Sequence, residues 1–257
     1  MGAGHAHRLY LERTSPVHGL PPHVKLVAAL AFVLVVVSTP HRQVWAFAGY
    51  AAMLAGVAAV GRVPAATVLR RMLVELPFVA FALLMPFVSR GERTEVLGVS
   101  VSVAGLWAAW NLLAKATLGV VTSILLAATT DLRDLLLGLE RLRMPALIVQ
   151  IMSFMIRYAD VIADEMRRMR VARESRGFEG RDVRAVPVVA RSAGALFIRS
   201  YERGERVHLA MLARGYDGTF ATFSATREAH GAPRQWAAGL ALPGAALVVA
   251  LAAWGLA

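Results

Sequence analysis

The sequence predicts an all-α, polytopic membrane protein with about five transmembrane helices and a cytoplasmic helical domain. Hydrophobic residues make up 57% of the 257 residues, and the mean hydropathy is +0.55, whereas soluble globular chains contain roughly 45–50% apolar residues. The apolar residues gather into windows long enough to cross a bilayer. Most of the charged residues gather into one continuous block. These two patterns divide the chain into a membrane part and a charged part.

Five apolar segments approach the roughly 20 residues that span a hydrocarbon core. We expect membrane helices at residues 24–39, 44–60, 72–88, within 104–130, and at 236–256. Pro77 and Pro86 are expected to kink the third helix, because proline removes a backbone hydrogen bond. The predicted domains are an N-terminal membrane domain with four helices (1–130), the charged block (131–235) and a C-terminal transmembrane helix (236–257).

The charged block holds 18 of the 28 basic residues and 13 of the 17 acidic residues. An arginine at the centre of a bilayer costs about 2.5–3.5 kcal/mol, so we expect this block to lie in the cytoplasm. With the N-terminus also inside, the inner segments hold 24 basic residues and the outer loops hold 3. This asymmetry is the one that the positive-inside rule describes, and it predicts a cytoplasmic N-terminus.

Helices are predicted throughout the charged block. The first covers residues 131–142 and ends before Pro145, the second covers 145–176, and the third covers 185–214. The second carries apolar or aromatic residues at spacings of three and four, the period of one helix face; these are Ile148, Ile151, Met155, Tyr158, Ile162, Met166 and Met169.

An internal repeat marks the ends of the second and third of these helices. The first copy reads Ser-Arg-Gly-Phe-Glu-Gly (residues 175–180) and the second reads Ala-Arg-Gly-Tyr-Asp-Gly (residues 213–218). Glycine after a helix supplies a left-handed cap, and the preceding arginine projects from the last turn. The planar guanidinium fork suits a groove lined by carboxylates. A plain C-cap would explain Arg-Gly once, with the helix dipole favouring the arginine, but not a six-position match at two helix ends.

At these residues the chain resembles the transmembrane T component of energy-coupling factor transporters, the CbiQ/EcfT family. That family has two Ala-Arg-Gly signatures at the ends of cytoplasmic coupling helices. Residues 15–26, Ser-Pro-Val-His-Gly-Leu-Pro-Pro-His-Val-Lys-Leu, are also similar to the cobalt-type member. Ser175 departs from the signature, but it is still a small residue. The resemblance implies that Ser175, Arg176, Gly177, Ala213, Arg214 and Gly215 contact ATPase subunits.

The resemblance also implies a role and a set of partners. Such a subunit joins two cytosolic ATP-binding subunits to a membrane-embedded substrate-binding (S) component in the bacterial cell (inner) membrane. It implies uptake of cobalt or nickel, with the cargo chosen by another chain. The two lysines, Lys25 and Lys115, lie outside any phosphate-loop pattern, so we expect a non-catalytic chain that does not hydrolyse ATP by itself. We expect no cofactor and no catalytic residue.

Other functions have weaker support in the sequence. The chain has no cysteine, which excludes thiol nucleophiles and iron–sulfur clusters. Acids interspersed among the arginines argue against nucleic-acid binding, and no catalytic motif occurs within the membrane segments. The remaining alternative is another membrane transporter or channel subunit whose cytoplasmic helices bind an anionic partner.

Three further features invite a functional interpretation. Seven histidines suggest metal binding, but none forms a helical pair with a carboxylate, and we expect no metal site. Glu75 and Lys115 lie in or near membrane segments, where charged residues are often functional. Snorkelling to the interface or a structural pair across two helices is an equally good interpretation. Arg168 and Arg203 are expected to belong to the general charged surface.

Overall fold

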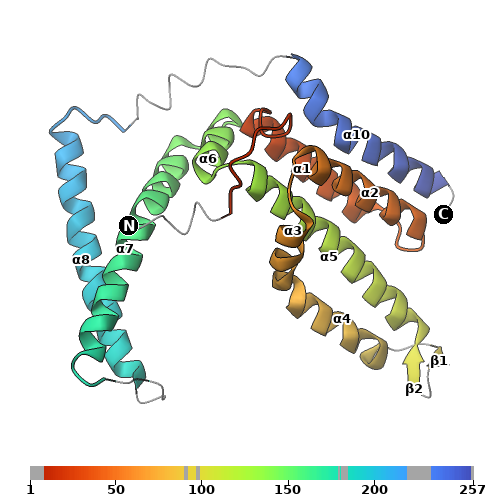
Figure 1. Ribbon diagram of the computed structural model, residues 1–257, viewed down its shortest axis with the longest axis horizontal. Helices are drawn as coiled ribbons and strands as arrows, with labels where there is room; N and C mark the ends of the chain where they lie inside the picture. Colours follow the sequence, from red (N-terminus) through yellow and green to blue (C-terminus); the bar gives the residue numbers. More distant parts are fainter. Residues whose placement is uncertain are drawn as a thin grey trace. The chain divides into compact units, whose positions relative to one another are not determined.

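The computed structural model describes residues 9–89, 92–96, 99–178, 180, 185–218 and 233–255. The chain divides into two compact units. One contains residues 8–138 and 230–257, and the other contains residues 1–7 and 139–229. We call the first the membrane unit and the second the coupling unit, after the coupling helices that the family resemblance implies, and describe each by itself (Figure 1).

The membrane unit is a bundle of apolar helices. Its elements are α1 (Pro22–Ser38), α2 (Val44–Val60), α3 (Ala65–Arg71), a 3-10 turn η2 (Met72–Glu75), α4 (Leu76–Val88), α5 (Val103–Thr129) and α10 (Pro233–Gly255). Helix α6 (Leu132–Arg141) begins in this unit. Helix α1 packs on α10 and α5, and α4 packs along α5.

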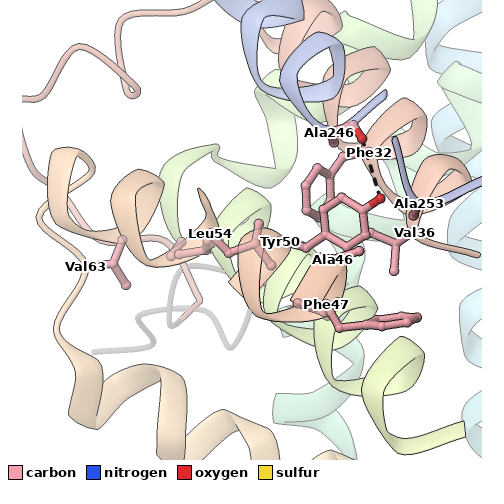
Figure 2. Close-up of a cluster of buried hydrophobic side chains, with 12 residues drawn as sticks. Phe32, Val36, Ala46, Phe47, Tyr50, Leu54, Val63, Ala246 and Ala253 are labelled. Atoms are coloured by element: carbon pink, nitrogen blue, oxygen red, sulfur yellow. Dashed lines mark hydrogen bonds between the residues drawn. The ribbon is translucent and has the colours of Figure 1, made fainter. Parts of the chain in front are cut away.

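The core of this unit lies between α1, α2, α5 and α10. Figure 2 shows Tyr50 of α2 among Phe32, Val36 and Ala246, with its hydroxyl directed at the Ala246 carbonyl 3.5 Å away. The same hydroxyl lies 2.9 Å from Thr39 Oγ1. A tyrosine that is fully buried needs such partners, so Tyr50 ties α2 to the end of α1 and to α10.

Within the described residues, four helices are long and apolar enough to cross a membrane: Ala65–Val88, Val103–Thr129, Ala146–Glu174 and Pro233–Gly255. Three of them cover predicted membrane segments. Helices α1 and α2 are apolar but have 17 residues each, the lower end of the spanning range. The prediction of a polytopic all-α membrane protein is confirmed, although Ala146–Glu174 had been assigned to the charged block. Its first turns carry few charges, so this helix too contains an apolar window long enough to cross a membrane.

The third predicted helix differs from the structure in its start. It begins at Ala65 and is interrupted by η2 before Pro77, with Pro86 inside α4. Because Pro77 has no N–H and its ring crowds the preceding turn, the residues before it tighten into a 3-10 turn. A small antiparallel hairpin, β1 (Arg93–Val96) and β2 (Val99–Ser102), was not predicted. Its signal in the sequence is the alternation of β-branched residues at Thr94 and Val96 and at Val99 and Val101.

The coupling unit contains the end of α6, α7 (Ala146–Glu174) and α8 (Val186–Leu212). These bounds confirm the predicted helices at 145–176 and 185–214 to within two residues. Pro145 precedes the first residue of α7 and Pro187 lies in the first turn of α8, positions where a missing N–H costs nothing.

Candidate functional site

Helices α7 and α8 form an antiparallel pair held by polar contacts between residues 165–173 of α7 and residues 192–203 of α8. Arg173 Nη1 donates to Ser192 Oγ over 2.7 Å. Nearer the middle, Glu165 accepts from both Arg199 (3.1 Å) and Arg203 (3.2 Å). Figure 1 shows the two helices close together where α7 ends and α8 begins, and diverging towards their other ends. Residue 173, near the end of α7, contacts residue 192 near the start of α8, whereas residue 165 contacts residues 199 and 203. The end of α7 therefore lies beside the start of α8.

This antiparallel arrangement places the two Arg-Gly ends at opposite ends of the pair. Ser175, Arg176 and Gly177 follow α7, and Ala213, Arg214 and Gly215 follow α8. Helix α8 has 27 residues, which at 1.5 Å per residue gives a separation of about 40 Å. The structure therefore does not bring the six predicted site residues into one site, but forms two matching sites far apart.

The end of α7 is a Schellman cap. Gly177 has φ of +79°. Its N–H donates to Glu174 O over 3.0 Å, and the N–H of Phe178 donates to Arg173 O over 3.1 Å. These are the two bonds that define the motif. A Cβ at Gly177 would meet no atom within 4 Å, so glycine is required by the backbone conformation and not by space.

The end of α8 repeats the same geometry. Gly215 has φ of +84°, its N–H donates to Leu212 O over 3.0 Å, and the N–H of Tyr216 donates to Met211 O over 3.0 Å. The residue before each glycine, Arg176 or Arg214, is thus at an equivalent position at its helix end. The backbone geometry repeats at the arginine, the glycine and the aromatic residue of each copy. It differs at the last position, where Gly218 has φ of +96° and Gly180 has no positive φ; Glu179 lies outside the described residues.

Both arginines are exposed, as are the small residues before them. Among the described residues, neither guanidinium makes a hydrogen bond or an ion pair. Most arginines nearby differ: Arg167, Arg170, Arg173, Arg199 and Arg203 are all engaged within the unit. Two guanidinium forks are therefore presented to solvent with no hydrogen-bond or ion-pair partner among the described residues.

The expectation for Arg203 is wrong. Its guanidinium bonds to Glu165 across the helix pair, so it holds α7 to α8 and does not belong to a general charged surface. Sequence reasoning missed it because the 38-residue separation of the partners leaves no local pattern. Arg168 is exposed and keeps its predicted role as a surface residue.

The second end has a brace that the first lacks. Tyr216 donates from its hydroxyl to Gln150 Oε1 over 2.6 Å, and Gln150 Nε2 donates to Gly218 O over 2.8 Å. Gln150 is buried and lies in the first turns of α7. In the sequence, Gln150 stands out only as a single amide within an apolar stretch. Phe178 occupies the position equivalent to Tyr216 and has no hydroxyl.

The other charged candidates have structural partners within the membrane unit. Glu75 is buried and accepts a hydrogen bond from Thr117, whereas Lys115 donates to Val37 O over 2.7 Å. Each therefore ties α5 to another element, and they do not form an ion pair with each other. The described residues contain no group of three or more metal-ligating side chains; His5, His7 and His230 lie outside them.

Comparison with known proteins places the chain among membrane transport components. A profile of the family described as cobalt transport protein, CbiQ, matches residues 13–223. The energy-coupling factor transporter transmembrane protein EcfT of Thermanaerovibrio acidaminovorans is 32% identical over 228 residues, covering 81% of this chain and 82% of that protein.

Two further relatives match shorter stretches. The cobalt transport protein CbiQ of Rhodobacter capsulatus is 28% identical over 127 residues, covering 49% of this chain and 52% of that protein. An uncharacterized protein of Methanocaldococcus jannaschii is 34% identical over 100 residues, and the match covers 39% of this chain and 37% of that protein.

Proposed function

The chain belongs to the CbiQ family of cobalt transport proteins, and from that premise we propose that it is the transmembrane scaffold of an ATP-driven energy-coupling factor importer. In this role it joins two cytosolic ATP-binding subunits to a separate substrate-binding membrane subunit. It lies in the bacterial cell membrane with its N-terminus in the cytoplasm. It performs no catalysis; ATP hydrolysis belongs to the partner subunits.

The observation that supports this role best is the pair of exposed arginines at matching caps. Arg176 and Arg214 are equivalent in backbone geometry and lie at opposite ends of the α7–α8 pair. Two equivalent ends about 40 Å apart suit two copies of one ATP-binding subunit. Each copy would offer a carboxylate-lined groove to one guanidinium, which can bind a carboxylate through two parallel hydrogen bonds.

Transmission of movement requires that the two ends stay linked. The contacts of Glu165 with Arg199 and Arg203, and of Arg173 with Ser192, hold α7 and α8 together between the two caps. When the ATP-binding subunits close on ATP, the two ends would be drawn together or turned. A linked helix pair passes such a movement on to the membrane subunits instead of absorbing it.

The cargo in this proposal is cobalt or nickel. The proposal rests on the family and on the similarity to a cobalt transport protein. We assign cargo recognition to the separate substrate-binding subunit, as the family resemblance implies.

The test is purification of the chain from detergent with the ATP-binding subunits co-expressed. We expect both subunits to co-purify, and ATP hydrolysis to appear in the complex but not with the chain alone. The double variant Arg176→Ala/Arg214→Ala should release the ATP-binding subunits, whereas Arg168→Ala should retain them. Hydrolysis by the isolated chain above the level of an empty-vector preparation would contradict the proposal.

A further inference from the structure

Two adjacent cavities in the membrane unit are not used by the coupling role. The first, which we call the head pocket, has a volume of about 580 Å³ and is lined by Tyr10, Glu12, Arg13, Thr14 and Arg62. The second, which we call the chain slot, has a volume of about 160 Å³ and is mainly apolar. Its walls come from residues 17–20, α1, α2, α5 and α10, and include Val17, Ala29, Leu54, Val57 and Leu242.

The two cavities have no lining residue in common, but their linings come within a few residues of each other at two places. Along the N-terminal segment, Thr14 lines the head pocket and Val17, three residues later, lines the chain slot. Near the end of α2, Val57 lines the slot, and Arg62 lines the head pocket five residues later. The Val57 carbonyl accepts from the N–H of Gly61, the residue before Arg62, over 2.8 Å. A polar cavity thus borders an apolar one at the point where the apolar helix α2 ends, which is where a membrane surface is expected.

The head pocket is built to present positive charge. Arg13 and Arg62 are both exposed. Arg13 Nη1 donates to the backbone carbonyl of Arg62 over 2.8 Å, which brings the two arginines together. Arg62 has φ of +52° because it stands at the C′ position of a Schellman cap that ends α2, where its N–H donates to Ala59 O over 3.0 Å and the N–H of Val63 donates to Ala58 O over 2.9 Å. Thr14 and Tyr10 add hydroxyl donors.

The N-terminal wall of the pocket is fixed before any ligand binds. Leu11 N–H donates to Ala128 O of α5 over 3.0 Å, and the His18 ring lies 2.7 Å from Ser15 Oγ and 3.2 Å from Leu11 O. Burial lowers the pKa of His18 below its usual 6.5, so the ring is neutral at pH 7. A neutral ring can accept from Ser15 while donating to Leu11.

We propose that the head pocket and the chain slot together bind one anionic phospholipid, with its phosphate on Arg13 and Arg62 and part of one acyl chain in the slot. Basic pockets between membrane helices on the cytoplasmic side are known to take anionic headgroups. The slot is smaller than the roughly 300–1,000 Å³ of pockets for drug-sized ligands, which fits a short stretch of chain. Lys25 also lines the slot, but its ammonium donates to Thr129 O over 2.8 Å and serves to join α1 to α5.

The test measures binding of phosphatidylglycerol and phosphatidylcholine with the same acyl chains to the purified full-length protein in detergent, by native mass spectrometry. We expect phosphatidylglycerol to be retained preferentially. Arg13→Gln and Arg62→Gln should each lower its apparent affinity about fivefold, the effect of one basic residue near an anionic surface. Arg42→Gln removes the same charge from an exposed residue outside the pocket and should leave the affinity unchanged.

Glu12 provides a test of opposite sign. Its carboxylate lines the same pocket and opposes a phosphate, so Glu12→Gln should raise the affinity for phosphatidylglycerol about fivefold. A loss on Glu12→Gln, or equal retention of both lipids by the unmodified protein, would overturn the proposal.

The slot is tested by filling it. Ala29→Phe, or Ala29→Leu if the larger residue lowers expression, should weaken retention of phosphatidylglycerol while both arginines remain in place. Inorganic phosphate and glycerol 3-phosphate serve as competitors without chains. If either displaces the lipid at equal concentration, or if filling the slot changes nothing, the pocket takes free phosphate and the lipid assignment is wrong. None of these outcomes depends on the ATP-binding subunits.

Discussion

Arg176 and Arg214 each combine an ordered backbone at a helix end with an exposed side chain. The Schellman bonds fix the Cα of each arginine relative to its helix, and the guanidinium is left to solvent. Ordering the backbone in advance lowers the entropy that a partner must remove on binding. The two arginines therefore suit docking at the two ends of the helix pair.

Substitution of either arginine is predicted to impair coupling. Truncating one side of a desolvated charge pair costs about 2–5 kcal/mol, much of it from the partner carboxylate left unpaired. Arg176→Ala and Arg214→Ala should therefore each reduce metal uptake by the reconstituted complex, and the double variant should abolish it. Arg→Lys should restore little, because a point charge cannot replace the planar fork.

The control for these variants is Arg168→Ala, an exposed arginine on α7. Arg203→Ala is unsuitable, since it also removes an ion pair with Glu165. A double variant that is monodisperse, keeps its ATP-binding subunits and still transports metal would show that the Arg-Gly ends are helix caps alone.

At the scale of single elements, glycine allows α4 and α5 to approach closely. A Cβ at Gly105 would lie 2.6 Å from Met85 O and 2.7 Å from Pro86 Cα, both backbone atoms that cannot rotate away. Small residues at such crossings let helix backbones meet in membranes. The side chain of Ser102, which accepts from Gly105 N–H over 3.4 Å, caps α5 at the same point.

Gly105→Ala is predicted to force α4 away from α5. Overpacking of this kind costs about 1–3 kcal/mol and should lower the thermal midpoint of the protein in detergent. Gly119→Ala on the same helix is the matched control, because a Cβ there meets no atom within 4 Å. It should be neutral or stabilising by about 0.5–1 kcal/mol, as alanine favours helix. Equal effects of the two substitutions would contradict the close approach.

The brace at the end of α8 gives a second prediction for an element. Tyr216→Phe removes the hydroxyl that donates to Gln150 and leaves a buried amide oxygen without that partner. We expect a loss of about 1 kcal/mol and faster proteolysis after residue 216, with the first helix end unaffected. Tyr201→Phe alters a tyrosine that is 67% exposed and should change neither. If the two variants have the same stability and the same rate of proteolysis, the brace contributes nothing to stability.

At the scale of the whole molecule, the distribution of basic residues predicts the orientation. With 24 basic residues in the inner segments and 3 in the outer loops, reversal would place most of the charge on the disfavoured side. A reporter that is active only in the periplasm should work when fused after Ser89. A fusion after Gly180 should report the cytoplasm. Periplasmic activity at Gly180 would remove the basis for docking of cytosolic subunits.

The amino-acid sequence by itself determined the helices and both caps. Apolar windows, prolines and an Arg-Gly repeat act within a few residues of where they stand, because helix periodicity and capping are local interactions. The bounds of α2, α7 and α8 follow from such signals to within two residues. The predicted start of the third helix, at residue 72, is wrong because the helical segment begins at Ala65. The turn before Pro77 belongs to the interior of that longer segment, where it tightens into a 3-10 turn.

Tertiary structure alone decided how these elements combine. That the two caps stand at opposite ends of one helix pair depends on α8 folding back antiparallel on α7, with Glu165 bonded to residues 34 and 38 positions away. The approach of Arg13 to Arg62 spans 49 positions and that of Glu75 to Thr117 spans 42. Such contacts leave no periodic trace in a single sequence, because their partners meet only after the chain has folded and packed its helices.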